Sequence, residues 1–287
     1  MRVVRSPMST YTLSSLWRYP VKSMAGEELK VVDVTAGGFT GDRAYALVDT
    51  ATRRVATAKS VKKFGELLKY HAEFATPPEP DGPMPPVRIT LPDGAVIQSD
   101  QPGAAGVLAQ VFGPQVSLMS TAPGDLILEF AAGTLGGNYA QTTELPVASA
   151  APPGKFFDYA SIHIVTTSTL QSLKAAYPEG QVAIQRFRPN LVVDCAGESG
   201  FVENSWIGRT LAIGPEMVLR VSIPCPRCVM ITLPRADLPR DPRILRAIAQ
   251  VNTLDLGDFG DLPCVGVYAD VVKPGRIRRG DTVRIID

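Results

Sequence analysis

Two cysteines separated by a proline and an arginine are the residues of this 287-residue chain best suited to do chemistry. They are Cys225 and Cys228 in the stretch IPCPRCVMITLP, residues 223–234. Thiols at this spacing serve in disulfides, zinc sites, thiol redox and the ligation of softer metals. The guanidinium of Arg227 between them favours the thiolate anion, which is the form that binds a metal. The pair therefore marks a candidate site with several possible chemistries.

The positions of the other possible ligands argue against zinc. A structural zinc site takes four ligands, and Cys195, Cys264, His71 and His163 are scattered without a second pair. A glutaredoxin-type pair needs its first cysteine at a helix N-terminus, whereas the run VMITLP, 229–234, predicts a strand and then a breaker. Ligation of a soft metal remains possible, beside the ordinary interpretation of an incidental packed thiol pair, and composition alone does not choose between molybdenum and copper.

The overall composition is that of an ordinary globular chain. Lysine and arginine number 29 against 28 acidic residues, so no global charge points to nucleic acid or a membrane surface. Four cysteines in this length do not make a disulfide scaffold. The N-terminus lacks the apolar core of a signal peptide, and no apolar stretch approaches the roughly 20 residues that span a bilayer. We expect a cytoplasmic protein with no nucleic-acid and no membrane partner.

Short strands separated by glycine- and proline-rich turns are predicted for the first half of the chain. The expected elements are strands at 12–20, 29–35 and 44–49, a helix at 60–73 with Ser60 as its cap, a proline-rich loop at 75–86 and a hairpin at 87–98.

A break at 144–156 separates a second region of similar texture. The expected elements there are strands at 161–167 and 187–195, a hairpin at 210–224, closing strands at 265–286, and helices at 168–178, capped by Ser168, and 241–252, with a proline in its first turn. Short strands outnumber helices. The pattern favours a mainly β, barrel-containing architecture with some α over a doubly wound α/β fold.

Five motifs, taken in order, give a family resemblance. They are LWRYPVKSMAGEEL (16–29), GDRAYALVD (41–49), RFRPNLVV (186–193), CPRCVMITLP (225–234) and GVYADVVKPGRIRRGD (266–281). Together they resemble the MOSC proteins, a family named for the C-terminal domain of molybdenum cofactor sulfurase. The family includes the mitochondrial amidoxime-reducing component and its bacterial relatives.

This resemblance implies an α+β fold of two domains. A MOSC N-terminal β-barrel-type domain is expected at 12–145, and a MOSC domain with a pyruvate-kinase-β-barrel-like fold at 146–287, after a disordered extension at 1–11.

The resemblance also implies a molybdenum–pterin cofactor (Mo-molybdopterin) and its contacts. Cys228, the second cysteine of C-x-R-C, falls on the family's metal ligand and is the expected catalytic residue; Lys22, Ser23, Arg43, Arg188, Asn190 and Arg227 fall on cofactor-binding positions. Cations and a hydroxyl suit a phosphate, which arginine grips through two parallel hydrogen bonds. An asparagine satisfies both donors and acceptors on a pterin edge.

Each of these residues also has an ordinary structural interpretation. Lys22 could be a solvated turn lysine, and Arg43 could pair with Asp42 or Asp49 on the surface. Arg188 and Asn190 could close a strand end. In the same way, Cys225 is expected to be a neighbouring thiol with no required role.

Five further positions bear on the resemblance. Lys59, in Thr-Ala-Lys, stands where the family commonly has arginine, which weakens the case for a bidentate contact. Asp158 and His163 are expected near the cofactor without contacting it. Met24 and Pro226 depart from the family pattern, so a degenerate member that uses the cleft for another anion is a further interpretation.

The implied function is reduction of N-hydroxylated small molecules, such as amidoximes, hydroxamates or hydroxylamines, by oxygen-atom transfer to molybdenum. The chain ends at Asp287 and holds no additional cysteine cluster, so we expect no iron–sulfur cluster and a separate electron-donor protein. No pyridoxal phosphate is expected. The alternative is a non-catalytic carrier of the cofactor or of sulfur, for which the site would look nearly identical.

Overall fold

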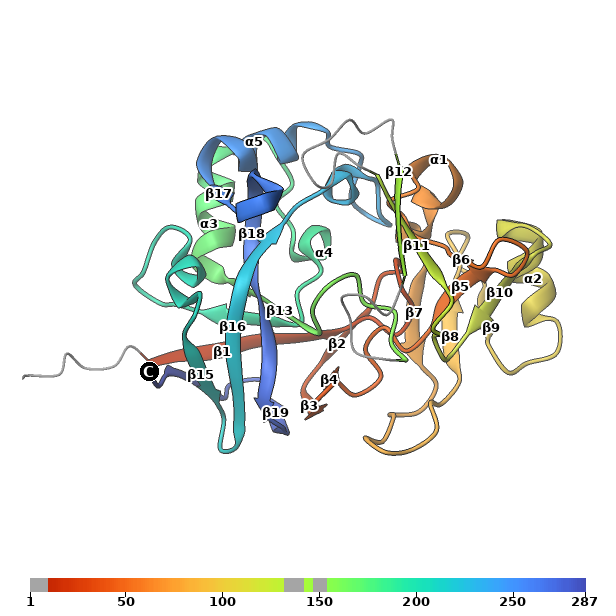
Figure 1. Ribbon diagram of the computed structural model, residues 1–287, viewed down its shortest axis with the longest axis horizontal. Coiled ribbons are helices and arrows are strands. Elements are labelled where there is room, and N and C mark those ends of the chain that lie inside the picture. Colours follow the sequence, from red (N-terminus) through yellow and green to blue (C-terminus); the bar gives the residue numbers. More distant parts are fainter. Residues whose placement is uncertain (1–9, 132–141, 147–153) are drawn as a thin grey trace, which may run out of the picture.

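The largest sheet of the protein closes into a β-barrel (Figure 1). The structure is a computed structural model and describes residues 10–131, 142–146 and 154–287. Seven strands follow in the order β13–β14–β1–β20–β15–β16–β18, and β13 also pairs with β18 to close the ring. Their bounds are β1 Thr10–Arg18, β13 Ile162–Thr166, β14 Leu191–Asp194, β15 Thr210–Ile213, β16 Met217–Pro226, β18 Asp261–Lys273 and β20 Thr282–Ile285. Short strands β2 (Glu27–Leu29) and β17 (Thr253–Asp255) extend the sheet.

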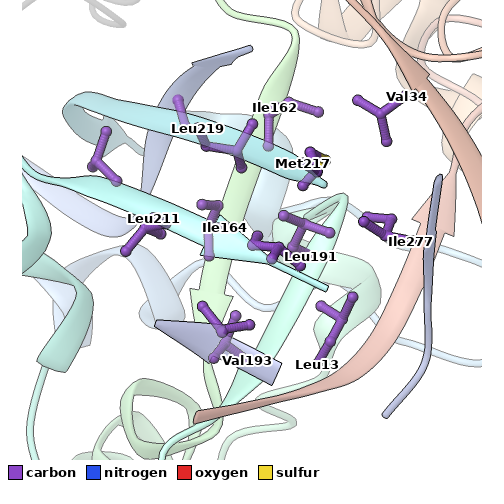
Figure 2. Packing of buried hydrophobic residues seen from close by; sticks show 14 of the residues in the cluster. Leu13, Val34, Ile162, Ile164, Leu191, Val193, Leu211, Met217, Leu219 and Ile277 are labelled. Atoms are coloured by element: carbon purple, nitrogen blue, oxygen red, sulfur yellow. The ribbon is translucent and has the colours of Figure 1, made fainter. Parts of the chain in front are cut away.

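The barrel interior is filled by aliphatic side chains from alternate positions of its strands. Leu13, Ile164, Leu191 and Leu211 are all fully buried, and Figure 2 shows them converging with their neighbours. Because successive side chains of a strand point to opposite faces, each strand supplies one apolar row to this core. The mainly β prediction for the chain is confirmed by this architecture.

The N-terminal strand belongs to the barrel although it precedes the other barrel strands by more than a hundred residues. β1 pairs antiparallel with β14 (Leu16 with Leu191) and with β20 (Tyr11 with Val283). The sheet therefore crosses the predicted boundary between 145 and 146, which itself stays a prediction. β1 begins at Thr10, so residues 10 and 11 are strand and not extension; residues 1–9 lie outside the described part of the chain.

Three smaller sheets make up the rest of the β structure in the described part of the chain. One has the order β10–β5–β6–β11–β12, with bounds Val116–Met119, Ala46–Asp49, Arg54–Val55, Ile127–Ala131 and Thr142–Pro146. The others are β19–β3–β4 (Gly275–Arg278, Val31–Thr35, Gly38–Phe39) and β7–β8–β9 (His71–Phe74, Val87–Thr90, Val96–Gln98). β19, from the end of the chain, thus pairs with β3, from its beginning.

Helices are short and cover the outside of the sheets. They are α1 Val61–Phe64, α2 Ala104–Phe112, α3 Thr167–Ala176, α4 Ile184–Phe187 and α5 Arg243–Val251, with 3₁₀ turns η1 Gly65–Lys69, η4 Val202–Trp206, η5 Val229–Thr232 and η6 Gly257–Phe259. α3 and α5 gather beside β18 (Figure 1) and bury Leu173 and Ile248 against Val165 of β13 and Val265 of β18. Within the described residues no helix has the length and apolarity needed to cross a bilayer.

The predicted helix at 60–73 is wrong in its second half. α1 runs only to Phe64, a 3₁₀ turn follows, and His71 opens β7. Ala72 pairs with Ile89 of β8, so sheet pairing overrides the helical spacing of the apolar residues. Ser60 occupies the N-cap position of α1 as predicted, but its side chain makes no capping hydrogen bond.

Two other local predictions need correction. The run after Cys228 is the 3₁₀ turn η5 and not a strand, because it leaves the barrel after β16 ends at Pro226. The helix predicted from Ser168 is capped by Thr166, whose hydroxyl accepts from the amide of Thr169 at 3.2 Å.

Gly266 in β18 offers a test of barrel closure. Its φ is +79°, and an added Cβ would lie 2.4 Å from the carbonyl oxygen of Ile164 and 2.5 Å from Nε2 of His163. We expect Gly266→Ala to lower the free energy of unfolding by about 2–5 kcal/mol, measured by urea denaturation. Gly94→Ala is the matched control: φ is +88° but nothing lies within 4 Å, so only the backbone cost of about 1–2 kcal/mol is expected. Equal losses in the two variants would contradict the closure argument.

Candidate functional site

All seven predicted site residues line one cavity of about 310 Å³. They are Lys22, Ser23, Arg43, Arg188, Asn190, Arg227 and Cys228. The wall is built from segments 22–59 and 156–268, so both halves of the chain contribute. Convergence of these residues is a property of the fold; their roles as cofactor contacts stay predictions.

Unusual backbone geometry is concentrated in this wall. Among the described residues four non-glycine positions have positive φ, and three of them are Ser23 (66°), Arg43 (47°) and Arg188 (56°). Such conformations cost free energy and persist where surrounding contacts enforce them, often at functional sites. The site residues are thus held in place by their environment and not by local preference.

Asp42 is the contact point for three segments of the site. Its fully buried carboxylate accepts from the amide of Tyr19 at 2.8 Å and from Nδ2 of Asn190 at 2.8 Å, and it forms an ion pair with Arg43. Arg43 does pair with Asp42, but the ion pair does not lie on the surface, because Asp42 has no exposed area. A buried, fully hydrogen-bonded carboxylate fixes the orientation of everything that donates to it.

Tyr19 separates two of the cations. The guanidinium carbon of Arg43 lies 4.4 Å from the ring centroid, and that of Arg188 lies 4.2 Å from it. Cation–π attraction to the ring partly offsets the repulsion between the two guanidiniums. Burial raises the pKa of Tyr19 to about 12, although both arginines act to lower it, so its hydroxyl stays protonated and donates to the carbonyl of Pro189 at 3.1 Å.

Lys22 is buried and paired, which excludes the solvated turn lysine. Its Nζ donates to the carbonyl of Phe156 at 2.8 Å and to Oδ1 of Asp158 at 2.5 Å, while Oδ2 of Asp158 lies 3.1 Å from Nζ of Lys59. Burial lowers the pKa of Lys22 to about 8, opposed by Asp158 and assisted by Lys59. Burial acts to raise the pKa of Asp158, but two ammonium groups together hold it well below its usual range. The Asp158 carboxylate pairs with two ammonium groups, whereas Lys22 has only this one carboxylate and shares it with Lys59. For this reason the pKa of Asp158 is lowered in spite of its burial, whereas Asp158 does not restore the pKa of Lys22 to its ordinary value.

Asn190 and Ser23 are occupied by contacts within the protein. Asn190 accepts from the amide of His163 at 3.1 Å through Oδ1 and donates to Asp42 through Nδ2. Ser23 Oγ accepts from the amide of Ala58 at 3.1 Å. Both side chains hold the wall together, so positioning is their structural role here.

Two arginines fasten α4, which precedes Arg188, to η5, which follows Cys228. Arg186 is fully buried and donates to the carbonyls of Gln181, Ile231 and Pro239; Arg235 donates to those of Gln185, Arg186 and Met230. These bonds fix the separation between a predicted anion-binding arginine and the predicted metal ligand. The motif RFRPN contains Arg186, but sequence pattern alone assigned it no role.

Cys228 and its neighbour differ in environment. Cys228 is half-buried in the cavity wall at the start of η5, whereas Cys225 is buried in β16. Arg227 donates from Nη1 to the sulfur of Cys225 at 2.9 Å and from Nη2 to the carbonyl of Phe187 at 2.9 Å. Within the described residues no three His, Cys, Asp or Glu side chains gather as a metal site.

The depressed pKa of Lys22 predicts a pH dependence of stability. The folded state holds this proton less tightly than the unfolded chain, so between pH 8 and 10.5 the unfolded state binds more protons and stability rises with pH. The slope from this group is about 1 kcal/mol per pH unit at most, and Lys22→Met is expected to remove it. Urea denaturation across this pH range measures the slope. Lys62→Met, at an exposed position, is the control; an unchanged slope in Lys22→Met would contradict the assignment.

Comparison with known proteins identifies both domains. Residues 10–70 match the MOSC N-terminal beta barrel domain, and residues 152–284 match the MOSC domain. Among curated proteins, mitochondrial amidoxime reducing component 2 of Rattus norvegicus is 31% identical over 135 residues, 45% of this chain and 38% of the relative. The human component 2 is 31% identical over 130 residues, 44% of this chain and 37% of the relative. The match thus spans under two-fifths of the length of these relatives.

Solved structures give weaker similarity. The YUAD protein from Bacillus subtilis aligns over 97% of both chains at 13% identity with a TM-score of 0.44, and YiiM from Geobacillus stearothermophilus over 45% of this chain and 55% of its own at 18% identity with a TM-score of 0.33. Neither similarity is close enough to support an argument. The two domain matches, in the order that the motifs predict, establish that the chain belongs to the MOSC family.

Proposed function

We propose that this chain binds a molybdenum–pterin cofactor in the cavity and reduces N-hydroxylated compounds with electrons from a separate protein. One observation carries the proposal: the half-buried thiol of Cys228 shares a pocket with six basic side chains and one acidic side chain, Asp158. The basic residues are Lys22, Arg43, Lys59, Arg186, Arg188 and Arg227. The chain as a whole has a net charge of only +1, so this excess is local.

Unsatisfied donors in the wall fit a ligand rich in anionic and acceptor atoms. Within the described residues no carboxylate lies within ion-pair distance of Arg188, whose Nη1 donates to the carbonyl of Met24 at 2.5 Å. Nε of Arg227 is buried without a hydrogen-bond partner. A phosphate and a pterin ring supply the acceptors that these groups lack.

The cofactor, when bound, supplies two-electron redox chemistry and acceptance of an oxygen atom. The sulfur of Cys228 would hold its metal, and Lys22, Lys59 and Arg188 would anchor its phosphate. Tyr268 also lines the cavity, and burial, followed by the negative charge on Cys225, raises its pKa well above the ordinary value. The Tyr268 hydroxyl therefore keeps its proton at neutral pH and acts as a hydrogen-bond donor in the wall.

Part of the cavity is apolar and suits the body of a substrate. Leu256, Phe259 and Leu262 line it, and Phe259 is 49% exposed on the turn η6. A polar cofactor gains little from such a surface, whereas an aromatic or aliphatic group buries apolar area against it. We therefore include an apolar body in the proposed substrate class.

Replacement of Cys228 is the central test. We expect Cys228→Ala, made in a cofactor-competent host, to lose bound molybdenum and to abolish reduction of benzamidoxime by an artificial reductant, because the metal loses its protein ligand. Elemental analysis and a turnover assay measure both effects. Cys195→Ala removes a buried thiol from the barrel core and serves as the control.

Two outcomes would overturn the proposal. Turnover near the wild-type rate in Cys228→Ala would refute the assignment of this ligand. Wild-type protein with tightly bound molybdenum and no reduction of any N–O compound would instead favour the non-catalytic carrier.

Phe259 tests the apolar part of the cavity. Phe259→Ala is expected to raise KM for benzamidoxime about 3- to 10-fold, from the loss of roughly 0.5–1.5 kcal/mol of aromatic contact, and to leave hydroxylamine kinetics unchanged. Steady-state kinetics with both substrates provide the comparison, and Val272→Ala, at a 61% exposed position outside the cavity lining, is the control. Equal changes for both substrates would show that the contact is not with the substrate body.

A further inference from the structure

Cys225 lies behind the cavity wall, and its sulfur meets a charged group. The side chain is 1% exposed in β16, and Nη1 of Arg227 donates to Sγ at 2.9 Å. This distance is short for nitrogen to sulfur and is typical of a charge-assisted bond. The environment of Cys264 is different. This thiol is fully buried opposite Pro226 in the strand register, and the Cys264 sulfur contacts the carbonyl of Leu262 at 3.3 Å instead of a charged group.

Arg227 is held on three sides. Besides the bond to Cys225, its Nη2 donates to the carbonyl of Phe187, and its guanidinium carbon lies 5.7 Å from the centroid of the Phe187 ring. Nε is buried and has no partner. Because the planar guanidinium presents its donors in a fixed fork, fixing two nitrogens also fixes the direction in which the third donates.

Other groups around the sulfur also favour its anion. Burial alone would raise the pKa of Cys225, but Arg227, then His163 and Tyr268, lower it to about 6. His163 and Tyr268 lie opposite each other across β13 and β18, and the remaining thiol nearby, Cys264, has a pKa raised by burial to about 12. Cys225 is therefore the thiol of this cluster whose anion is favoured by its surroundings.

We propose that Cys225 is a positioning residue whose buried sulfur serves as a thiolate counter-ion and holds the guanidinium of Arg227 against the cavity. Its effect on catalysis rests on the proposed function; its effect on Arg227 does not. The sequence predicts a thiol with no required role at this position. A neutral thiol there would leave the buried guanidinium without a counter-charge. The two cysteines of C-P-R-C thus have different roles: Cys228 faces the cavity, and Cys225 orients Arg227 between them.

The first experiment uses ligand-free protein and needs no enzyme activity. The thiolate absorbance of the wild type is compared with that of Cys225→Ala at about pH 8 and about pH 5. The Nε–Hε NMR signal of Arg227, assigned by its loss in Arg227→Lys, is recorded in the same samples. We expect one thiolate to be missing from Cys225→Ala at the higher pH, together with a broadened or lost Arg227 signal. Cys264→Ala, which removes the neighbouring thiol, is expected to change neither.

The second experiment uses holoprotein and separates charge from shape. We expect kcat/KM for benzamidoxime to fall about tenfold in both Cys225→Ala and Cys225→Ser, because serine keeps the size but not the charge. Cys225→Asp is expected to recover part of the loss. Thermal unfolding of each variant verifies that it is folded.

The outcomes distinguish the two proposals. An unchanged thiolate absorbance and an unchanged Arg227 signal in Cys225→Ala would overturn the counter-ion, whatever the activity. The expected spectral changes in a protein that reduces no N–O compound would support the counter-ion and count against the proposed reductase.

Discussion

The site depends on one buried carboxylate. Asp42 ties the end of β1, the β4–β5 connection and the start of β14 together by accepting from Tyr19, Arg43 and Asn190. Asn190 extends the tie to β13 through the amide of His163. A carboxylate with no exposed area is stable only if its acceptors are used, and each donor here comes from a segment that forms the cavity wall. The hydrogen bonds that the buried carboxylate of Asp42 needs therefore also hold the segments of the cavity wall in place.

Gathering cations in one cavity is costly unless each is compensated. The compensations differ in kind: a carboxylate for Arg43, a carboxylate shared by Lys22 and Lys59, an aromatic face for Arg188 and, in our proposal, a thiolate for Arg227. Arg188 is the cation held mainly by a neutral ring, and it leaves positive charge available to a ligand. This pattern of compensated and available charge is what a dedicated anion site requires.

The barrel supplies the rigidity that these contacts need. β1 enters from the N-terminal part of the chain and is hydrogen-bonded on both edges by strands from the C-terminal part. Segments just beyond β1 are thereby fixed relative to β14, β16 and the turn η5 that carries Cys228. Backbone positions with positive φ at Ser23, Arg43 and Arg188 persist because this framework leaves them no alternative.

The sequence by itself determined the residue types and their order: a mainly β chain, the hairpin at 87–98, the helix after 167, the C-P-R-C pair and the five motifs that predict the family. The strands, hairpin and helix follow from local periodicity and turn chemistry, and the family follows from the resemblance of the motifs to those of MOSC proteins. Only the tertiary structure decided that Asp42 is buried, that Tyr19 lies between two arginines, that Cys225 meets a guanidinium and that 71–74 is a strand. Those features arise from burial and from partners distant in sequence, and no local pattern encodes how far a side chain will lie from water or which charge will face it.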